Sequence, residues 1–344
     1  MTGKTDDRAQ IFVGVDGGAT KTRVVVGDGD GTVLAEGTGG PTNFQVVGTS
    51  QAGANLASAL TAAMTSISPA ACHTPRVARM TVGMAGLDSA ADVPPIRTLL
   101  EQALAACGLE TDWQVVNDAV IAWAGALGGQ AGGIVISGSG AAALAVNSRR
   151  QLFHADGLGH WLGDDGSGFE IGRNGLRAAV RAQEGRGPET LLVGPLLRLC
   201  GGNVSQWAAR LTADGALAHR EMAQFAPEVV QAAAAADPVA LAVLIDAGRA
   251  LAETAGSVLR RAGLADAVSN DPAPVATIGS LFVHAKPLRA AFCGKMTALL
   301  PNCQVIWPRQ QPAEGALILA RSPDLLPENV LAVRNPKPIN HYDR

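Results

Sequence analysis

Residues 11–27 of the chain read IFVGVDGGATKTRVVVG. The apolar run IFVGV predicts a buried strand, DGGATK predicts a tight glycine-rich turn, and TRVVVG predicts a second strand. The polar turn DGDG at 28–31 then leads to a third predicted strand at 32–36. The chain therefore opens with three antiparallel strands joined by short turns.

The same pattern occurs again at residues 133–154. A buried strand, GIVI, is broken by SGSG at 137–140, and two further strands are predicted at 141–146 and 151–154. Strand, glycine turn, strand, polar turn and strand thus recur in one order. We interpret this as an internal duplication, although two unrelated hairpins could share the pattern.

Alternating helical and strand patterns follow each copy, which predicts an α/β chain of two domains. We expect an N-terminal domain at 1–121, joined by a helix near 313–321. A C-terminal domain is expected at 122–312, and the proline-rich end at 322–344 is expected to form an extended tail.

The composition fits two globular domains. The 344 residues are 47% hydrophobic and 17% charged, with a net charge of −3, which gives no electrostatic reason to expect a nucleic-acid partner. The polar start at 1–10 predicts a loose tail rather than a signal peptide, and we expect no membrane span. Five scattered cysteines without a Cys-x-x-Cys pair favour a reducing compartment, so we expect a cytoplasmic protein.

The first glycine turn could bind phosphate and a metal ion. Its glycines let backbone N–H groups approach an anion, and the Asp16 carboxylate could hold Mg²⁺ directly or through water. The alternative is a tight hairpin that simply needs glycine. The candidate residues are Asp16, Gly17, Gly18, Thr20, Lys21 and Thr22.

Two further turns could contact a nucleotide. The second glycine turn could hold the other side of a phosphate chain. A strand at 276–278 ends at Gly279-Ser280 before a helix and could approach an adenosine, although such junctions are common. The candidate residues are Ser137, Gly138, Ser139, Gly140, Gly279 and Ser280.

Asn117-Asp118 follows a predicted strand at 113–116 and opens a helix. A carboxylate at this place could accept the proton of an attacking hydroxyl group, as phosphoryl transfer requires. The competing interpretation is that Asp118 is an N-cap, which needs no catalysis to explain it.

The loop at 157–167, GLGHWLGDDGS, could bind a sugar. Asp164 could accept hydrogen bonds from two adjacent hydroxyl groups, and Trp161 could stack on a sugar face. Alternatively, this is a structured loop in which Asp165 or Ser167 caps the next helix, and a lone His160 is more often structural than catalytic.

These motifs, in order, resemble the BadF/BadG/BcrA/BcrD-type ATPases and, within them, the N-acetylglucosamine kinases. The resemblance runs from about Val13 to Ala320. Two positions depart from the usual pattern: Ala19 replaces a third glycine, and Asp165 stands where glutamate is common. The resemblance rests on GVDGGATKT, PTNFQVVG, GMAG, VVNDA, ISGSGA, GHWLGDDGSGFEIGR, TIGS and EGALILA.

The resemblance implies a duplicated, two-domain actin-like ATPase fold of the ribonuclease H-like type, with mixed sheets flanked by helices and a central cleft. It implies ATP with Mg²⁺ and transfer of the γ-phosphate to the 6-hydroxyl of an amino sugar, foremost N-acetylglucosamine. Asp118 matches the catalytic carboxylate, Asn43 and Asp164 match sugar-binding residues, and the two glycine turns match the phosphate-binding turns. We further expect a homodimer.

Several alternatives stay open. The acceptor could be glucosamine, N-acetylmuramate or glucose. An ATPase activator of a radical dehydratase would need clustered cysteine ligands for its iron–sulfur cluster, but no cysteine lies between residues 108 and 199. A sugar-sensing regulator would need an added DNA-binding domain. A sugar-binding protein without catalytic activity is the remaining possibility.

Overall fold

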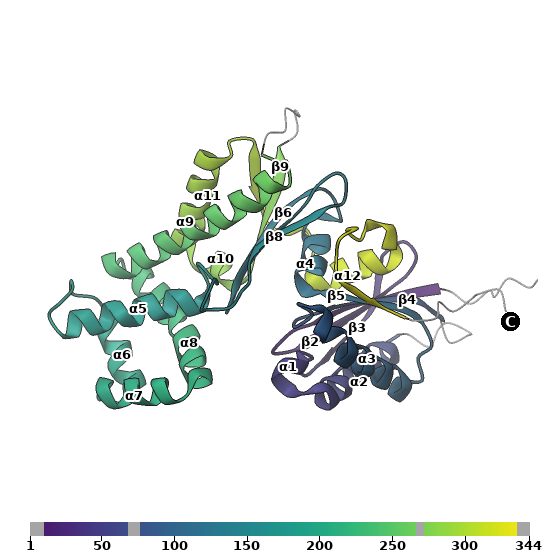
Figure 1. Ribbon diagram of the computed structural model, residues 1–344, viewed down its shortest axis with the longest axis horizontal. Coiled ribbons are helices and arrows are strands. Elements are labelled where there is room, and N and C mark those ends of the chain that lie inside the picture. Colours follow the sequence, from purple (N-terminus) through teal and green to yellow (C-terminus); the bar gives the residue numbers. More distant parts are fainter. Residues whose placement is uncertain (1–9, 68–75, 266–271, 336–344) are drawn as a thin grey trace, which may run out of the picture. The chain divides into compact units, whose positions relative to one another are not determined.

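The computed structural model describes residues 10–67, 76–265 and 272–335. The chain divides into two compact units (Figure 1). The first contains the residues up to 131, residues 148–152 and the residues from 308 onward, and the second contains residues 132–147 and 153–307. The expected loose start before Gln10, the end of the tail after 335 and Cys72 lie outside the described residues. Cys107, Cys200, Cys293 and Cys303 are free thiols.

Each unit is built on one sheet. The sheet of the first unit has the strand order β11-β5-β4-β1-β2-β3, and that of the second has the order β10-β9-β6-β7-β8. The strands of the first sheet are β1 (Gln10–Gly17), β2 (Thr22–Gly27), β3 (Val33–Gly39), β4 (Arg76–Met84), β5 (Asp112–Asn117) and β11 (Ala332–Arg334). Those of the second are β6 (Gly132–Ser137), β7 (Ala141–Val146), β8 (Leu152–Asp156), β9 (Ala273–Ile278) and β10 (Cys303–Ile306).

The two sheets repeat one topology. β1 pairs antiparallel with β2 and parallel with β4, and β6 pairs antiparallel with β7 and parallel with β9. The outer parallel pairs, β4 with β5 and β9 with β10, correspond as well. The strands β1, β2, β4 and β5 therefore match β6, β7, β9 and β10 in order and direction, and β3 and β8 take corresponding edge positions, which confirms the predicted duplication.

In the first unit, the helices α1 (Phe44–Val47), α2 (Thr49–Thr65), α3 (Val93–Cys107), α4 (Asp118–Leu127) and α12 (Pro312–Arg321) surround the sheet. Leu56 and Leu60 of α2 lie one turn apart and are fully buried, so this face of the helix belongs to the core of the unit. α12 packs on β1 and α4 so closely that an added Cβ at Gly14 or Gly315 would overlap main-chain atoms of the neighbouring element. Close helix packing therefore depends on glycine at these positions.

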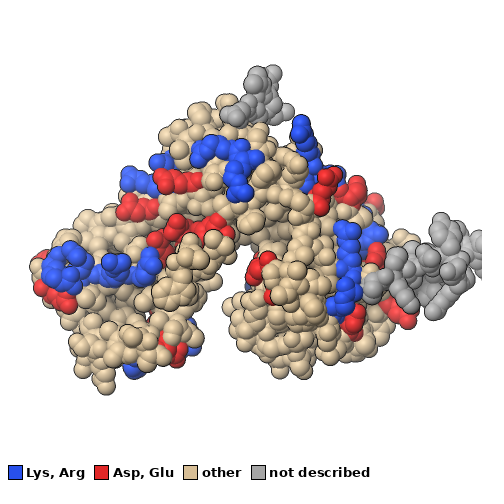
Figure 2. Space-filling model, viewed as in Figure 1, with Lys and Arg blue, Asp and Glu red and all other residues tan. Residues whose placement is uncertain are grey.

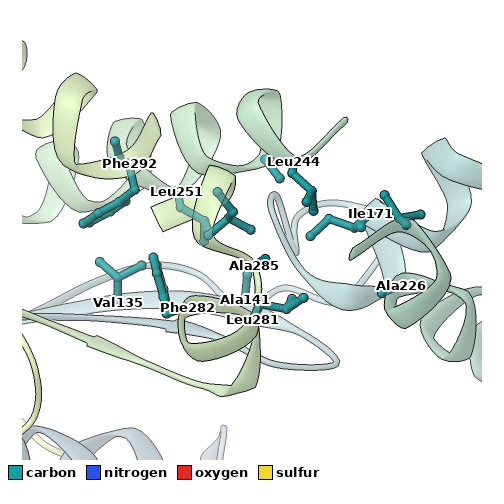
Figure 3. Close-up of a cluster of buried hydrophobic side chains, with 14 of the residues drawn as sticks. Val135, Ala141, Ile171, Ala226, Leu244, Leu251, Leu281, Phe282, Ala285 and Phe292 are labelled. Carbon is teal, nitrogen blue, oxygen red and sulfur yellow. The ribbon is translucent and has the colours of Figure 1, made fainter. Parts of the chain in front are cut away.

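The second unit carries α5 (Gly168–Gln183), α6 (Val193–Cys200), α7 (Val204–Ala213), α8 (Gly215–Ala234), α9 (Pro238–Arg261), α10 (Ser280–His284) and α11 (Lys286–Leu299). Its core joins the sheet to these helices (Figure 3). Val135 of β6 lies with Leu251 of α9, and the rings of Phe282 and Phe292 make an edge contact at a centroid distance of 5.2 Å. Burying such rings stabilises the unit beyond the apolar area that they remove from water.

The structure differs from the expected division at several places, since residues 148–152 and 308–312 also belong to the first unit. The first unit extends to residue 131 rather than 121, because α4 continues to Leu127 and packs against α12. The tail expected at 322–344 is not wholly extended, since Pro323–Leu325 form a 3₁₀ turn and β11 pairs antiparallel with β5. The apolar side chain of Val333 is buried there, which favours the pairing over a solvated tail.

Charged side chains of both signs are interspersed on the face shown in Figure 2, and basic side chains follow α5. Arg173, Arg177 and Arg181 of that helix are four residues apart and so lie on successive turns. No single described helix is long and apolar enough to cross a membrane. α8 and α9 pass that test of length and composition only as a pair, with a bend of 117° between them.

We predict that Gly315→Ala destabilises the chain by about 1–3 kcal/mol, because its methyl group would overlap the Ile121 carbonyl oxygen. The matched control is Gly294→Ala in α11, where an added Cβ meets nothing within 4 Å. This second change should raise stability slightly, since alanine favours a helix over glycine. Urea unfolding of both variants measures the difference, and equal shifts would contradict the packing argument.

Candidate active site

Three parallel strands of the first unit end at one edge of the sheet. Asp16 of β1 lies opposite Gly83 of β4, and Met84 of β4 lies opposite Asn117 of β5. Because parallel strands bring their carboxyl ends to the same edge, Asp16 and Asp118 come close enough for the charge of Asp16 to raise the pKa of Asp118.

Asn117, not Asp118, caps helix α4. Its side-chain oxygen accepts the N–H of Ala119 at 2.9 Å, and its Nδ2 donates to Oδ1 of Asp88 at 3.1 Å. The interpretation of Asp118 as the N-cap is therefore wrong. Asp118 is the first residue of the helix, so its carboxylate is not needed to begin it.

The Asp118 carboxyl is an acid of raised pKa. Burial raises its pKa to about 6, and the neighbouring carboxylates of Asp16 and Asp88 add to the rise, while the N–H of Ala119 opposes it. A group with this pKa is ionised at neutral pH yet binds a proton more readily than an exposed aspartate. These are the properties of a general base.

Asp16 also has a raised pKa, chiefly because it is buried. Lys21 and Arg23 oppose the rise, and Glu314 adds to it. Within the described ranges, no group of three or more His, Cys, Asp or Glu side chains could hold a metal ion. Mg²⁺ usually needs only one or two carboxylates, with phosphate and water as its other ligands, so the half-buried carboxylates of Asp16 and Asp118 fit this ion.

The first glycine turn is tied to the loop that follows β3. The Gly18 carbonyl oxygen accepts the N–H of Thr42 at 3.1 Å. The Thr22 side chain is buried, and its hydroxyl donates to the Gly40 carbonyl at 2.7 Å. Thr20 and Lys21 are exposed. The Thr22 hydroxyl is therefore engaged within the protein, contrary to the expectation that it donates to phosphate.

Asn43 lies next to this turn. Its backbone N–H donates to the Gly18 carbonyl at 3.4 Å, and its side-chain oxygen accepts the N–H of Gln45 at 3.0 Å as the N-cap of α1. The same oxygen lies beside Gly86, which has a positive φ of 93°. Asn43 is thus held between the first turn and the loop after β4.

In the second unit, the other glycine turn lies against Gly279. The Gly138 N–H donates to the Gly140 carbonyl at 2.9 Å, which closes the turn after Ser137. Gly279 has a φ of 111° and packs directly on the backbone of Ser137, where a side chain would not fit. The structure therefore brings Gly279 and Ser280 next to the turn, as parallel β6 and β9 require.

The loop at 157–167 follows β8. The Asp164 side chain is buried, and its carboxylate accepts the N–H of Ala141 at 2.9 Å. Burial raises the pKa of Asp164, and this hydrogen bond partly opposes the rise. Trp161 is 85% exposed, and Ser167 caps α5 by accepting the N–H of Glu170 at 3.2 Å. The prediction that Ser167 or Asp165 caps the helix is confirmed for Ser167.

Two carboxylates that no sequence pattern singled out, Asp156 and Asp88, organise these loops. Asp156 accepts the N–H groups of Gly157, Asp164 and Asp165, and Asp88 accepts the hydrogen bond from Asn117. Asp156 comes directly before a glycine-dense loop, which is a typical place for aspartate to bond to nearby backbone N–H groups. Asp88 gives no such signal, because its partner is distant in sequence.

Known proteins resemble this chain over most of its length. The sequence model of the BadF/BadG/BcrA/BcrD ATPase family matches residues 13–320. The chain is 27% identical over 320 residues to an N-acetyl-D-glucosamine kinase of Dictyostelium discoideum, and the alignment covers 90% of this chain and 98% of that relative. It is 26% identical over 313 residues to an N-acetylmuramic acid/N-acetylglucosamine kinase of Clostridium acetobutylicum, covering 91% of this chain and 99% of that one.

A solved structure described as a "Putative N-acetylglucosamine Kinase" from Chromobacterium violaceum is 27% identical and has a TM-score of 0.68. It covers 91% of this chain, and this chain covers 99% of it. The mixed sheets flanked by helices in each unit are those of the actin-like ATPase fold, as predicted.

We predict that Asp118→Asn stabilises the chain at alkaline pH. The folded-state pKa of about 6 lies above the ordinary value of 3.8, so the cost of ionised Asp118 is absent below pH 4, grows up to pH 6 and is complete above it. Asparagine removes this cost. Urea unfolding should show a gain on the order of 1 kcal/mol at pH 8 that shrinks toward pH 4.

The matched control is Asp112→Asn, at the other end of β5, where the carboxylate pairs with Arg79 at 3.0 Å. This pair is partly exposed, so its loss should give no gain at pH 8. A loss of stability by Asp118→Asn at both pH values would contradict the assignment.

Proposed function

Since the chain belongs to the BadF/BadG/BcrA/BcrD ATPase family, we propose that it is a sugar kinase that uses ATP to phosphorylate the 6-hydroxyl of N-acetylglucosamine. One observation carries this proposal: a half-buried carboxylate with a pKa raised to about 6, Asp118, stands at the carboxyl edge of three parallel strands. The names of the two curated relatives support an amino sugar as the acceptor.

Asp118 would act as the general base. Its carboxylate accepts the proton of the sugar 6-hydroxyl while the hydroxyl oxygen forms a bond to the γ-phosphorus. The bond between that phosphorus and the bridging oxygen breaks, and ADP leaves with the electron pair. Protonation of a carboxyl with this pKa is reversible near neutral pH, so the base is regenerated after each turnover.

Asp16 would hold Mg²⁺, which would supply positive charge to the transferring phosphate. The exposed Thr20 and Lys21 would contribute donors to the phosphate oxygens. Thr22 would act indirectly, since its hydroxyl holds the neighbouring loop at Gly40.

In the second unit, the turn from Ser137 to Gly140 would hold nucleotide phosphate, and Gly279 with Ser280 would lie beside the adenosine. Trp161 and Asp164 would be the acceptor-sugar residues of this unit, and Asn43 and Asp118 would be those of the first unit. Glucosamine, N-acetylmuramate and glucose stay alternative acceptors. The expected cytoplasmic location and homodimer also stay predictions.

We predict that the chain releases ADP from Mg-ATP in a manner that depends on N-acetylglucosamine, and that Asp118→Asn lowers kcat by about 10²–10⁴. Asparagine is close to aspartate in shape but cannot take up the hydroxyl proton, so the acceptor KM should change less than kcat. A coupled ADP assay with the four candidate sugars measures both constants.

Asp112→Asn is the control, because it makes the same chemical change at the opposite end of β5. Near-normal turnover by Asp118→Asn would refute the catalytic role. The proposed function as a whole would be wrong if none of the four sugars stimulated ADP release by the unmodified chain.

We predict that Asp16→Asn weakens Mg-ATP binding at least about tenfold, or about 1.4 kcal/mol, and leaves sugar affinity nearly unchanged. The reason is that Asp16 is proposed to meet the metal and not the acceptor. Asp30→Asn, in the exposed turn after β2, is the matched control. Calorimetry that finds equal losses for both ligands would show that Asp16 does not hold the metal.

A further inference from the structure

Four rings form a cluster in the second unit. His160 of the 157–167 loop contacts the rings of Trp161, Phe169 and His219, at centroid distances of 4.9, 4.7 and 4.9 Å. The ring of His219 stacks on Phe169 at 5.0 Å with only 15° between the planes. We call His160, Phe169 and His219 the ring anchor. It joins three segments: the loop, the start of α5 and helix α8.

The loop needs such an anchor because its glycines make it costly to order. Gly157, Gly159 and Gly166 all have positive φ values between 74° and 80°, and glycine loses more conformational entropy on ordering than any other residue. Hydrogen bonds hold the two ends of the loop: the Asp156 carboxylate accepts the N–H of Gly157 at one end, and those of Asp164 and Asp165 at the other.

Between these ends, one side chain faces inward. Leu158, Trp161 and Leu162 are exposed, whereas His160 is half-buried against the two other rings of the anchor. His160 therefore fixes the middle of the loop, from which the exposed Trp161 projects.

His219 completes the anchor from outside the loop. It lies on α8, which packs against α5. Burial lowers the pKa of His219, and the neighbouring His160 lowers it further, while Asp164 opposes this. A neutral imidazole stacks on a ring without burying an uncompensated charge.

We propose that His219 is a positioning residue for the acceptor sugar: by stacking on Phe169 and contacting the ring of His160, it holds the 157–167 loop, and with it Trp161 and Asp164, in the conformation that binds the acceptor. This inference rests on the proposed function, which assigns those two residues to the sugar. His219 acts through its ring and not through a hydrogen bond to the substrate, which separates it from a residue that binds the sugar directly.

The test compares His219→Ala with His219→Phe. Alanine removes the ring, whereas phenylalanine keeps the stack but cannot donate or accept a hydrogen bond. We expect His219→Ala to raise the KM for N-acetylglucosamine about tenfold with a smaller change in the KM for ATP, and His219→Phe to restore the original value. Arg220→Ala, at the exposed neighbouring position of α8, is the control and should change neither constant.

Hydrogen exchange provides a readout that does not need kinase activity. The N–H groups of Asp164 and Asp165 are bonded to Asp156, so their protection reports on the order of the loop. We expect faster exchange across 157–167 in His219→Ala, and unchanged exchange in His219→Phe and Arg220→Ala. Melting temperatures of all variants identify any that fail to fold.

The outcomes separate this inference from the function on which it rests. If exchange in the loop is the same in all variants, or if His219→Phe is as impaired as His219→Ala, His219 is not a positioning residue. Equal losses for sugar and ATP also overturn it. If the ring controls loop exchange while no sugar binds the unmodified chain, the loop anchor stands and its role toward an acceptor falls with the proposed function.

Discussion

The parallel pairing of β1, β4 and β5 is the constraint on which the candidate site depends. Parallel strands must end at one edge of the sheet, and this alone brings Asp16 near Asp118 although they are far apart in sequence. The same pairing in the second unit sets Gly279 against the turn after Ser137. Each glycine turn therefore faces residues that follow other strands of its own sheet, and duplication supplies such an edge twice.

The carboxylates at this edge of the sheet lower the stability of the fold. Burial beside Asp16 and Asp88 raises the pKa of Asp118, which means that the ionised carboxylate opposes folding at neutral pH. Close packing of the neighbouring elements offsets the destabilising effect of the ionised Asp118 carboxylate. Gly14, Gly125 and Gly315 let α12 lie directly on β1 and α4. Two guanidinium nitrogens of Arg23 donate hydrogen bonds to the two carboxylate oxygens of Glu314, at 2.9 and 2.7 Å. A rigid support of this kind holds the carboxylates together despite their repulsion.

In the second unit, the glycine-dense loop at 157–167 has to be held in one conformation. It must present Asp164 and Trp161 in a fixed arrangement, yet glycine favours disorder. Asp156 fixes the loop ends with hydrogen bonds, the Ala141 N–H donates to the Asp164 carboxylate, and the rings of His160, Phe169 and His219 fix the middle of the loop. Order in the loop thus comes from groups on β8, β7, α5 and α8.

The sequence by itself determined the strands and their repetition, because short apolar runs broken by glycine turns are local signals. It also determined the candidates Asp16, Asp118 and Asp164, since a carboxylate after a strand or in a glycine loop stands out locally. Only the tertiary structure decided their environments. Asn117 caps α4, and the Gly40 carbonyl accepts the hydrogen bond of the Thr22 hydroxyl. β11 pairs with β5, and the ring of His219 contacts that of His160, which is 59 residues away in sequence. These are long-range contacts, and local residue patterns carry no information about which distant group will occupy a hydrogen bond or complete a ring stack.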